Sequence, residues 1–238
     1  MYEERFYRSW VKSENLVKFE VIVEETDLLI SADKDLSQQA KTLVEKYRKD
    51  IKDYIALHPD FLTSLVPVKI DEKASDIVKE MELAAQKANV GPMAAVAGAV
   101  AEYVGRELLK DSRQVIIENG GDIFMKMDKE VRMGIYAGNS PLSGKIFIKI
   151  KPQDMPLGVC TSSGTVGHSL SFGKADAACI ISKSASLADA VATATGNIVK
   201  TKDDVEKAID YAKSVKGIDG ALVIIGDKIG AWGKIELV

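Results

Sequence analysis

The hydrophobic positions in the first half of the chain predict four strands around a group of helices. Apolar residues alternate with polar ones, or form short runs, in four segments expected as strands: Leu16–Val23, Leu28–Ser31, Val115–Ile117 and Ile123–Met125. Apolar residues recur at helical spacing in three stretches between the second and third strands: Asp35–Ile55, Ala74–Ala88 and Met93–Leu109. Strands that follow one another as adjacent pairs imply antiparallel pairing.

The second half repeats this order. Short apolar runs predict strands at Ile146–Ile150, Ser169–Phe172, Ala177–Ser182, Ala221–Ile225 and Ile229–Ile235. Helical spacing returns at Leu187–Ala194 and Asp203–Val215. Strand-strand-helix-helix-strand-strand therefore occurs twice, which predicts one domain, 1–238, with pseudo-repeats at about 16–127 and 146–236. The expected fold class is α+β, with antiparallel sheets and the helices packed on one face.

Composition and charge narrow the function classes. The net charge of −3 offers no basic field for nucleic acid and no polybasic patch for a membrane surface. No apolar run reaches the roughly 18–20 residues that a membrane helix requires, and the acidic N-terminal residues do not suit a signal peptide. Only two cysteines occur, Cys160 and Cys179, without a CxxC motif. We therefore expect a cytoplasmic protein that binds neither nucleic acid nor membrane.

A first candidate motif is Glu118–Ile123, where Asn-Gly-Gly-Asp separates two apolar runs. Such a pair of turn residues is a strong hairpin signal, because the turn requires positive φ. The functional alternative is that Gly120 and Gly121 leave exposed backbone N–H groups for a ligand. Asn119 and Asp122 would then add side-chain contacts to a nucleotide or sugar.

A second motif, Gly158–Gly173, combines glycines and hydroxyls with one thiol and one imidazole. Hydroxyls and free N–H groups suit a phosphate or carboxylate. Cys160 and His168 could form a nucleophile and its base, because the thiolate is the reactive form and an imidazole stabilises it. The alternative is a buried, inert cysteine and a core histidine.

A third motif spans Ser186 to Thr193. Ser186 and Asp189 have the spacing of a capping box, which is sufficient to explain Asp189. Thr193 lies one turn further on the same helical face. Asp and Thr oxygens one turn apart can instead share Mg²⁺, which completes its octahedron with water, backbone and phosphate oxygens. Both interpretations of Asp189 stay open.

Taken in order, these motifs resemble the ApbE superfamily of Mg-dependent FAD:protein FMN transferases. The first resembles their Asn-x-Gly-Gly-Asp pattern, the second their Thr-Ser-Gly segment with its following histidine, and the third their Ala-Asp-Ala-x-x-Thr. The resemblance implies Asp189 and Thr193 as magnesium ligands and His168 as a catalytic candidate. The pairing of a thiol with an imidazole adds Cys160 as a second catalytic candidate. It implies seven residues that bind FAD or another nucleotide: Asn119, Gly120, Gly121, Asp122, Ser162, Ser163 and Gly164.

The whole chain resembles more specifically an ApbE-like family of archaea and anaerobic bacteria, a divergent branch of that superfamily. The resemblance runs from Tyr7–Trp10 through Glu25–Leu28 and Gly91–Gly98 to the C-terminus, and it implies a T-fold-like architecture. Only three residues separate Gly164 from His168, where ApbE proteins carry a longer hairpin. The Asp-Pro-x-Thr-Gly stretch that follows their histidine is replaced in this chain by Ser171–Asp176.

Three functions remain open at this point. The first is Mg-dependent binding or transfer chemistry on a flavin or related nucleotide pyrophosphate, with a nucleotide ligand and an acceptor protein as partners. The second is sulfide assimilation or sulfur transfer through Cys160, which would have to be more reactive than Cys179. The third is a non-catalytic binding protein on a degenerate ApbE scaffold. Whether the protein is an enzyme and whether it forms a homodimer are left open.

Overall fold

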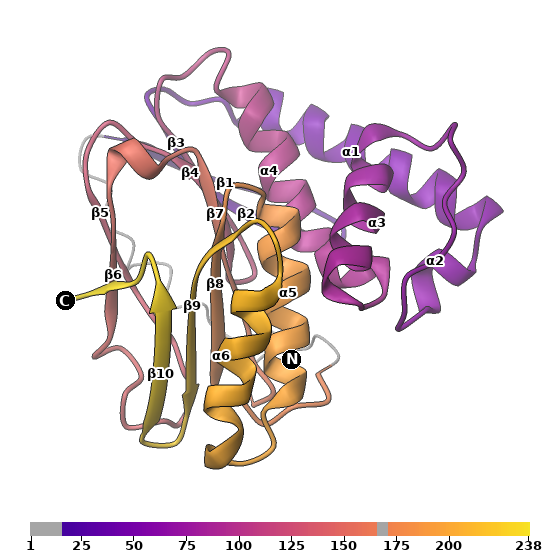
Figure 1. Ribbon diagram of the computed structural model, residues 1–238. Helices are drawn as coiled ribbons and strands as arrows, with labels where there is room; N and C mark the ends of the chain where they lie inside the picture. The colour runs from indigo at the N-terminus through magenta and orange to yellow at the C-terminus, as the bar shows by residue number, and fades with distance from the viewer. Residues whose placement is uncertain (1–15, 166–170) are drawn as a thin grey trace.

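A computed structural model of the protein describes residues 16–165 and 171–238. It has three layers: helices, a central eight-stranded antiparallel sheet, and a small three-stranded sheet (Figure 1). The large sheet has the strand order β1-β2-β3-β4-β7-β8-β9-β10. The helices lie on one face of this sheet, and the small sheet, β11-β6-β5, covers the other.

Along the chain, four helices lie between the first two and the next two strands of the large sheet. The hairpin β1 (Val17–Val23) and β2 (Thr26–Ala32) comes first, and the hairpin β3 (Val115–Asn119) and β4 (Asp122–Lys126) comes last. The helices between them are α1 (Ser37–Leu57), α2 (Asp60–Thr63), α3 (Asp76–Ala88) and α4 (Val96–Leu108). A short 3-10 helix, Pro92–Ala95, leads into α4.

The other four strands have the same plan with two helices. The strands β7 (Leu157–Ser162) and β8 (Ala177–Ser182) precede α5 (Ala185–Ile198) and α6 (Val205–Ser214). The strands β9 (Ile218–Ile225) and β10 (Lys228–Gly233) follow. Each half thus places its helices between the second and third of four antiparallel strands. The interpretation of this order as an internal duplication stays a prediction.

The small sheet explains why several strands of the large sheet are apolar on both faces. Its strands are β5 (Val131–Gly134), β6 (Phe147–Ile150) and β11 (Glu236–Leu237). In β3, Val115 and Ile117 pack against the helices, whereas Ile116 packs against the small sheet. Side chains alternate between the faces of a strand, so a strand covered on both faces is a continuous apolar run.

The expected α+β class, with antiparallel sheets and helices on one face, is confirmed. The strand predicted at Ile146–Ile150 is confirmed as β6, which lies in the small sheet. The segment expected at Ser169–Phe172 supplies no strand at Ser171 and Phe172, and its first two residues lie outside the described part. The T-fold-like description stays a prediction.

Within residues 16–165 and 171–238, each helix is too short or too polar to cross a membrane.

Candidate functional site

The structure brings the first and third motifs together at the first turn of α4. The Asn119 side-chain amide, at the end of β3, donates a hydrogen bond to the backbone oxygen of Ala97 (3.1 Å). The backbone N–H of Gly98 donates to Oδ2 of Asp189, on α5 (2.9 Å). Asn119 and Asp189, which lie more than 65 positions apart in the sequence, therefore bind to two consecutive residues in the first turn of α4.

The first motif is a two-residue hairpin turn, as the turn chemistry predicted. Gly120 and Gly121 have φ of +65° and +104°, in the region that favours glycine. The N–H of Gly121 donates to the carboxylate of Glu118 (2.9 Å). A Cβ built on Gly120 would meet no atom within 4 Å. The turn therefore faces open space, where a ligand could approach the backbone.

Asp122 and Cys160 face each other on the neighbouring strands β4 and β7. Both side chains are buried. The thiol of Cys160 lies 3.3 Å from the backbone oxygen of Ala185, and it also hydrogen bonds with the Asp122 carboxyl. Burial raises the pKa of the Cys160 thiol well above its usual value, and the nearby carboxyls of Asp122 and Asp189 raise it further.

This environment agrees with the alternative of a buried cysteine at position 160 and not with that of a reactive nucleophile. Neither cysteine is exposed: Cys160 packs on the helix face of the large sheet, and Cys179 on the small-sheet face. Burial likewise raises the pKa of Cys179, to about 12. A thiol with a raised pKa forms little thiolate at neutral pH. Cys160 is thus a buried, protonated side chain in this structure.

Asp189 and Asp122 form a pair of buried carboxyl groups. Burial raises the pKa of Asp189 to about 7, while hydrogen bonds from the N–H groups of Gly98 and Ala97 act in the opposite direction. Burial also raises the pKa of Asp122 well above its usual value, and the charge of Asp189 adds to this effect. Within the described ranges, neither carboxyl forms an ion pair with a lysine or arginine. Among the residues that the structure describes, Oδ1 of Asp122 has no hydrogen-bond partner.

The donor set around Asp189 fits a hard divalent cation. Thr193 is half-buried and lies one helical turn beyond Asp189. With the unpartnered oxygen of Asp122, these residues offer carboxylate and hydroxyl oxygens, which Mg²⁺ prefers. In the described part of the chain, no three His, Cys, Asp or Glu side chains converge as a metal cage. Mg²⁺ usually keeps water and phosphate ligands, so two or three protein oxygens suffice.

The second motif serves packing in part. The end of β7 carries Ser162, and Ser163 accepts a hydrogen bond from the N–H of Thr165 (3.1 Å). A Cβ on Gly164 would come within 2.2 Å of the backbone oxygen of Gly173, so this glycine permits a close backbone approach. His168 lies outside the described residues, and its predicted role stays a prediction.

The predicted N-cap of the third motif is wrong by two residues. Ser184, not Ser186, caps α5, and its hydroxyl accepts from the N–H of Leu187 (3.2 Å). Asp189 does not reach back to its own helix terminus, since its partners are on α4. Asp189 therefore caps α4, and the capping-box interpretation of its spacing from Ser186 is wrong.

Sequence reasoning missed Glu102, a fully buried carboxylate on α4. Its Oε2 accepts from the N–H groups of Ala185 and Ser186 (2.7 and 3.2 Å), and it forms an ion pair with Arg106. Burial raises the pKa of Glu102, and the charge of Arg106 opposes this. The available signal was a glutamate on the small-residue face of α4, beside Gly98 and Gly105.

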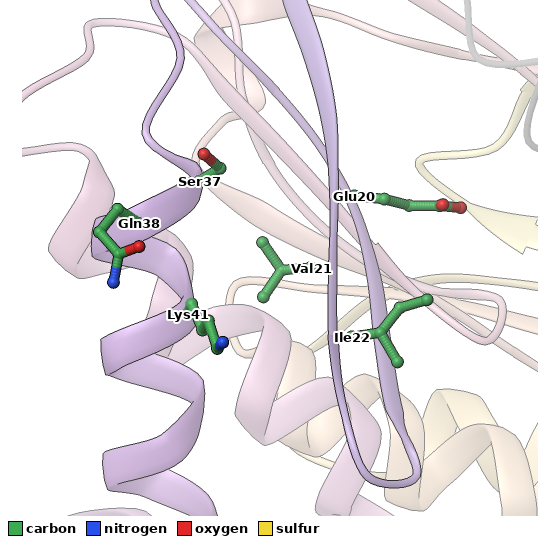
Figure 2. A pocket seen from close by; sticks show the side chains of 6 residues that line it. All are labelled: Glu20, Val21, Ile22, Ser37, Gln38 and Lys41. Carbon is green, nitrogen blue, oxygen red and sulfur yellow. The ribbon is translucent and has the colours of Figure 1, made fainter.

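A hollow of about 250 Å³ lies elsewhere, between β1 and the start of α1 (Figure 2). Its lining residues are Glu20, Val21, Ile22, Ser37, Gln38 and Lys41. In Figure 2, Val21 points toward α1, whereas Glu20 and Ile22 point to the other side of the strand. None of the residues in the three motifs lines this hollow, so it does not define the candidate site.

Solved structures that share this architecture include ApbE flavin transferases. The flavin transferase ApbE from Vibrio cholerae aligns with a TM-score of 0.60 at 12% identity, over 92% of this chain and 96% of that chain. The flavinyl transferase ApbE from Pseudomonas stutzeri aligns with a TM-score of 0.59 at 12% identity, over 92% and 94%. At this identity the likeness establishes the fold alone. The fold and the three motifs therefore define an ApbE-like protein.

The family follows from the sequence itself. The profile of the family described as "AbpE bacteria" matches residues 8–236, and the chain belongs to this family. A UPF0280 protein of Methanocaldococcus jannaschii is 43% identical over 228 residues, with 93% of each chain covered. Another from Methanosarcina acetivorans is 44% identical over 219 residues, covering 90% of this chain and 85% of that one. The predicted resemblance to an ApbE-like family with archaeal members is confirmed.

Proposed function

We propose that this protein binds the pyrophosphate of FAD, or of a related flavin nucleotide, together with Mg²⁺ and transfers its flavin-bearing phosphoryl group to an acceptor. A flavin-related role is supported by the fold shared with flavin transferases from two bacteria. The residues of this chain supply the finer proposal: a cation at Asp189 and Thr193, and a pyrophosphate beside the turn at Gly120 and Gly121. In this proposal the protein is an enzyme of the cytoplasm.

The observation that carries the proposal is the carboxyl pair of Asp122 and Asp189. Two buried carboxyls that have no cationic partner among the described residues cost folding free energy, because burial and mutual repulsion both disfavour their charged forms. Their raised pKa values express this cost. A divalent cation would remove the repulsion and satisfy the unpartnered oxygen of Asp122. The arrangement is therefore better suited to a cation-bound state than to a structural role alone.

The remaining motif residues would hold the nucleotide. The Gly120–Gly121 turn presents backbone to open space, and the half-buried side chain of Asn119 stands beside it. Hydroxyls of Ser162, at the end of β7, and of Ser163, which follows it, would face the phosphates from the other side. Gly164 would let the backbone come close there, since its own N–H donates to the backbone oxygen of Ala175. Bound Mg²⁺ would neutralise phosphate charge as a bond to phosphorus breaks.

In the proposed transfer, the bond between the FMN phosphorus and the bridging pyrophosphate oxygen breaks, and AMP leaves with that oxygen. A hydroxyl oxygen of the acceptor forms the new phosphorus–oxygen bond, and its proton passes to a base. We assign His168 as this acid or base. The acceptor is a protein hydroxyl, in keeping with the transferase resemblance.

The sulfur-transfer alternative has no supporting observation. It requires a reachable thiolate, whereas Cys160 is fully buried and its pKa is raised. Its position beside Asp122 and Ala185 gives it a packing role in the site. We therefore do not propose sulfur transfer.

Calorimetric titration with FAD tests the proposed function. We expect Mg²⁺ to tighten FAD binding by about ten-fold or more, which corresponds to ~1.4 kcal/mol. Asp189→Asn should abolish this gain, since the amide oxygen can still accept from Gly98 but does not bind Mg²⁺ well. Asp204→Asn, at an exposed capping box of a different helix, is the matched control and should retain the gain. Equal FAD affinity with and without Mg²⁺ in the parent protein would overturn the proposal.

A further inference from the structure

The helices α4 and α5 cap each other. The carboxylate of Glu102, on α4, accepts hydrogen bonds from the first N–H groups of α5, those of Ala185 and Ser186. The carboxylate of Asp189, on α5, accepts from the first-turn N–H of Gly98 on α4. The first N–H groups of a helix lack partners within it, and the helix dipole favours a negative charge there. Each helix therefore completes the N-terminus of the other.

Movement at one cap is transmitted to the other because the backbones of α4 and α5 are in close contact. A Cβ on Gly98 would lie 2.4 Å from the backbone oxygen of Ala185 and 2.8 Å from Cβ of Asp189. Atoms that are already in contact leave no room for one helix to slide along the other. A shift of the first turn of α5 would thus reach Asp189, which lies only one turn further along.

Among the described residues, Glu102 contacts the start of α5 and Arg106. Its side chain is completely buried and cannot meet a ligand in this structure. Besides the two N–H groups of α5, it accepts a hydrogen bond from the hydroxyl of Ser184 (3.3 Å) and forms an ion pair with Arg106, whose side chain reaches the surface. The same Ser184 hydroxyl also lies 3.1 Å from the carboxylate of Glu80 on α3. Two helices, α3 and α4, are therefore tied to the N-terminus of α5.

We propose that Glu102 is the positioning residue for Asp189. By holding the first turn of α5 against α4, it fixes Asp189 at the N–H of Gly98 and beside Asp122. This inference rests on the proposed function for its effect on Mg²⁺, but the positional step stands on the contacts alone. Glu102 does not touch substrate or cation.

Hydrogen exchange of the Gly98 amide tests the positional step directly. In Glu102→Leu, the N–H groups of Ala185 and Ser186 lose their acceptor, and we expect protection of the Gly98 amide to fall about ten-fold. In Glu102→Gln an amide oxygen can still accept, so the fall should be about two- to three-fold. The conservative variant also decides the question if the leucine variant does not fold.

Glu82 provides the matched control. It is a second buried glutamate, on α3, and its carboxylate accepts from the backbone N–H of Val68 (3.1 Å). Glu82→Leu should accelerate exchange at Val68 and leave Gly98 unchanged. Unchanged exchange at Gly98 in both Glu102 variants, or equal acceleration at Gly98 in Glu82→Leu, would overturn the proposal.

A titration of FAD binding against Mg²⁺ separates this inference from the proposed function. We expect Glu102→Gln to raise the half-saturating Mg²⁺ concentration about five-fold while FAD affinity at saturating Mg²⁺ changes less than about two-fold. Glu82→Leu should leave both quantities unchanged. If FAD binding by the parent protein does not depend on Mg²⁺, the proposed function fails. Hydrogen exchange at the Gly98 amide still decides the role of Glu102 in that case. An unchanged Mg²⁺ requirement in Glu102→Gln would contradict the positioning role.

Discussion

Adding a single methyl group at Gly98 should separate α4 from α5. The Cβ of Gly98→Ala would lie 2.4 Å from the backbone oxygen of Ala185 and 2.8 Å from Cβ of Asp189. The first of these atoms belongs to a helix backbone and cannot rotate away. One helix must therefore move, and the hydrogen bond from the Gly98 N–H to Asp189 lengthens with it.

Three contributions set the size of the effect. Overpacking costs about 1–3 kcal/mol, and weakening a buried hydrogen bond to a charged acceptor costs up to about 1.5–3 kcal/mol. Alanine regains about 1 kcal/mol of helix propensity over glycine. The destabilising contributions dominate, so we expect the free energy of unfolding to fall by about 2 kcal/mol or more.

Urea unfolding measures this change, with Gly196→Ala as the control. Gly196 lies in α5, and its added Cβ would meet its nearest atom at 3.6 Å, an ordinary contact. That variant should be neutral or more stable by up to about 1 kcal/mol. A Gly98→Ala protein as stable as the parent would refute the close approach of the two helices.

Three further predictions follow from buried or capping groups. A small alkylating reagent should modify neither Cys160 nor Cys179 while the protein is folded, and both after unfolding; rapid labelling of Cys160 alone would restore the sulfur-transfer alternative. Burial raises the pKa of Glu82 above its usual 4.5, so the folded state binds a proton more tightly than the unfolded state, and the stability of the parent protein falls as the pH rises above 4.5. Glu82→Gln lacks this titration, so its urea midpoint should rise relative to that of the parent from acid to neutral pH. A difference between the two midpoints that stays constant with pH would contradict this. Ser184→Ala should lose about 1 kcal/mol of unfolding free energy in the same assay, and no loss would refute its capping role.

Local patterns predicted the elements whose neighbours lie nearby in the chain. The hairpin at Gly120–Gly121 needs positive φ and follows from its turn residues. The helix α3 follows from its apolar spacing. The strand β7 was missed, because its small and polar residues reflect a distant contact. A Cβ on Gly158 would lie 2.3 Å from Cα of Ala185, so α5 requires the glycine that weakens the strand pattern.

The sequence named candidate residues for the site, but it could not predict their contacts. The motif order identified Asp122 and Asp189, and the register of β4 and β7 then sets Asp122 against Cys160. Spacing alone assigned Asp189 to the N-terminus of its own helix, because capping rules consider only local neighbours. Its actual partner, Gly98, is 91 residues away. The burial of Glu102 likewise depends on a helix terminus 83 residues further along.

Anomalous diffraction from crystals of the protein grown with Mn²⁺ and FAD tests the cation site most directly. Mn²⁺ accepts the same oxygen ligands as Mg²⁺, and its anomalous signal locates it independently of the flavin. We predict one peak within about 2.0–2.3 Å of Asp189 and Thr193 oxygens, shared with the pyrophosphate of FAD. Bound FAD with its pyrophosphate elsewhere, or a cation that avoids Asp189, would contradict the account.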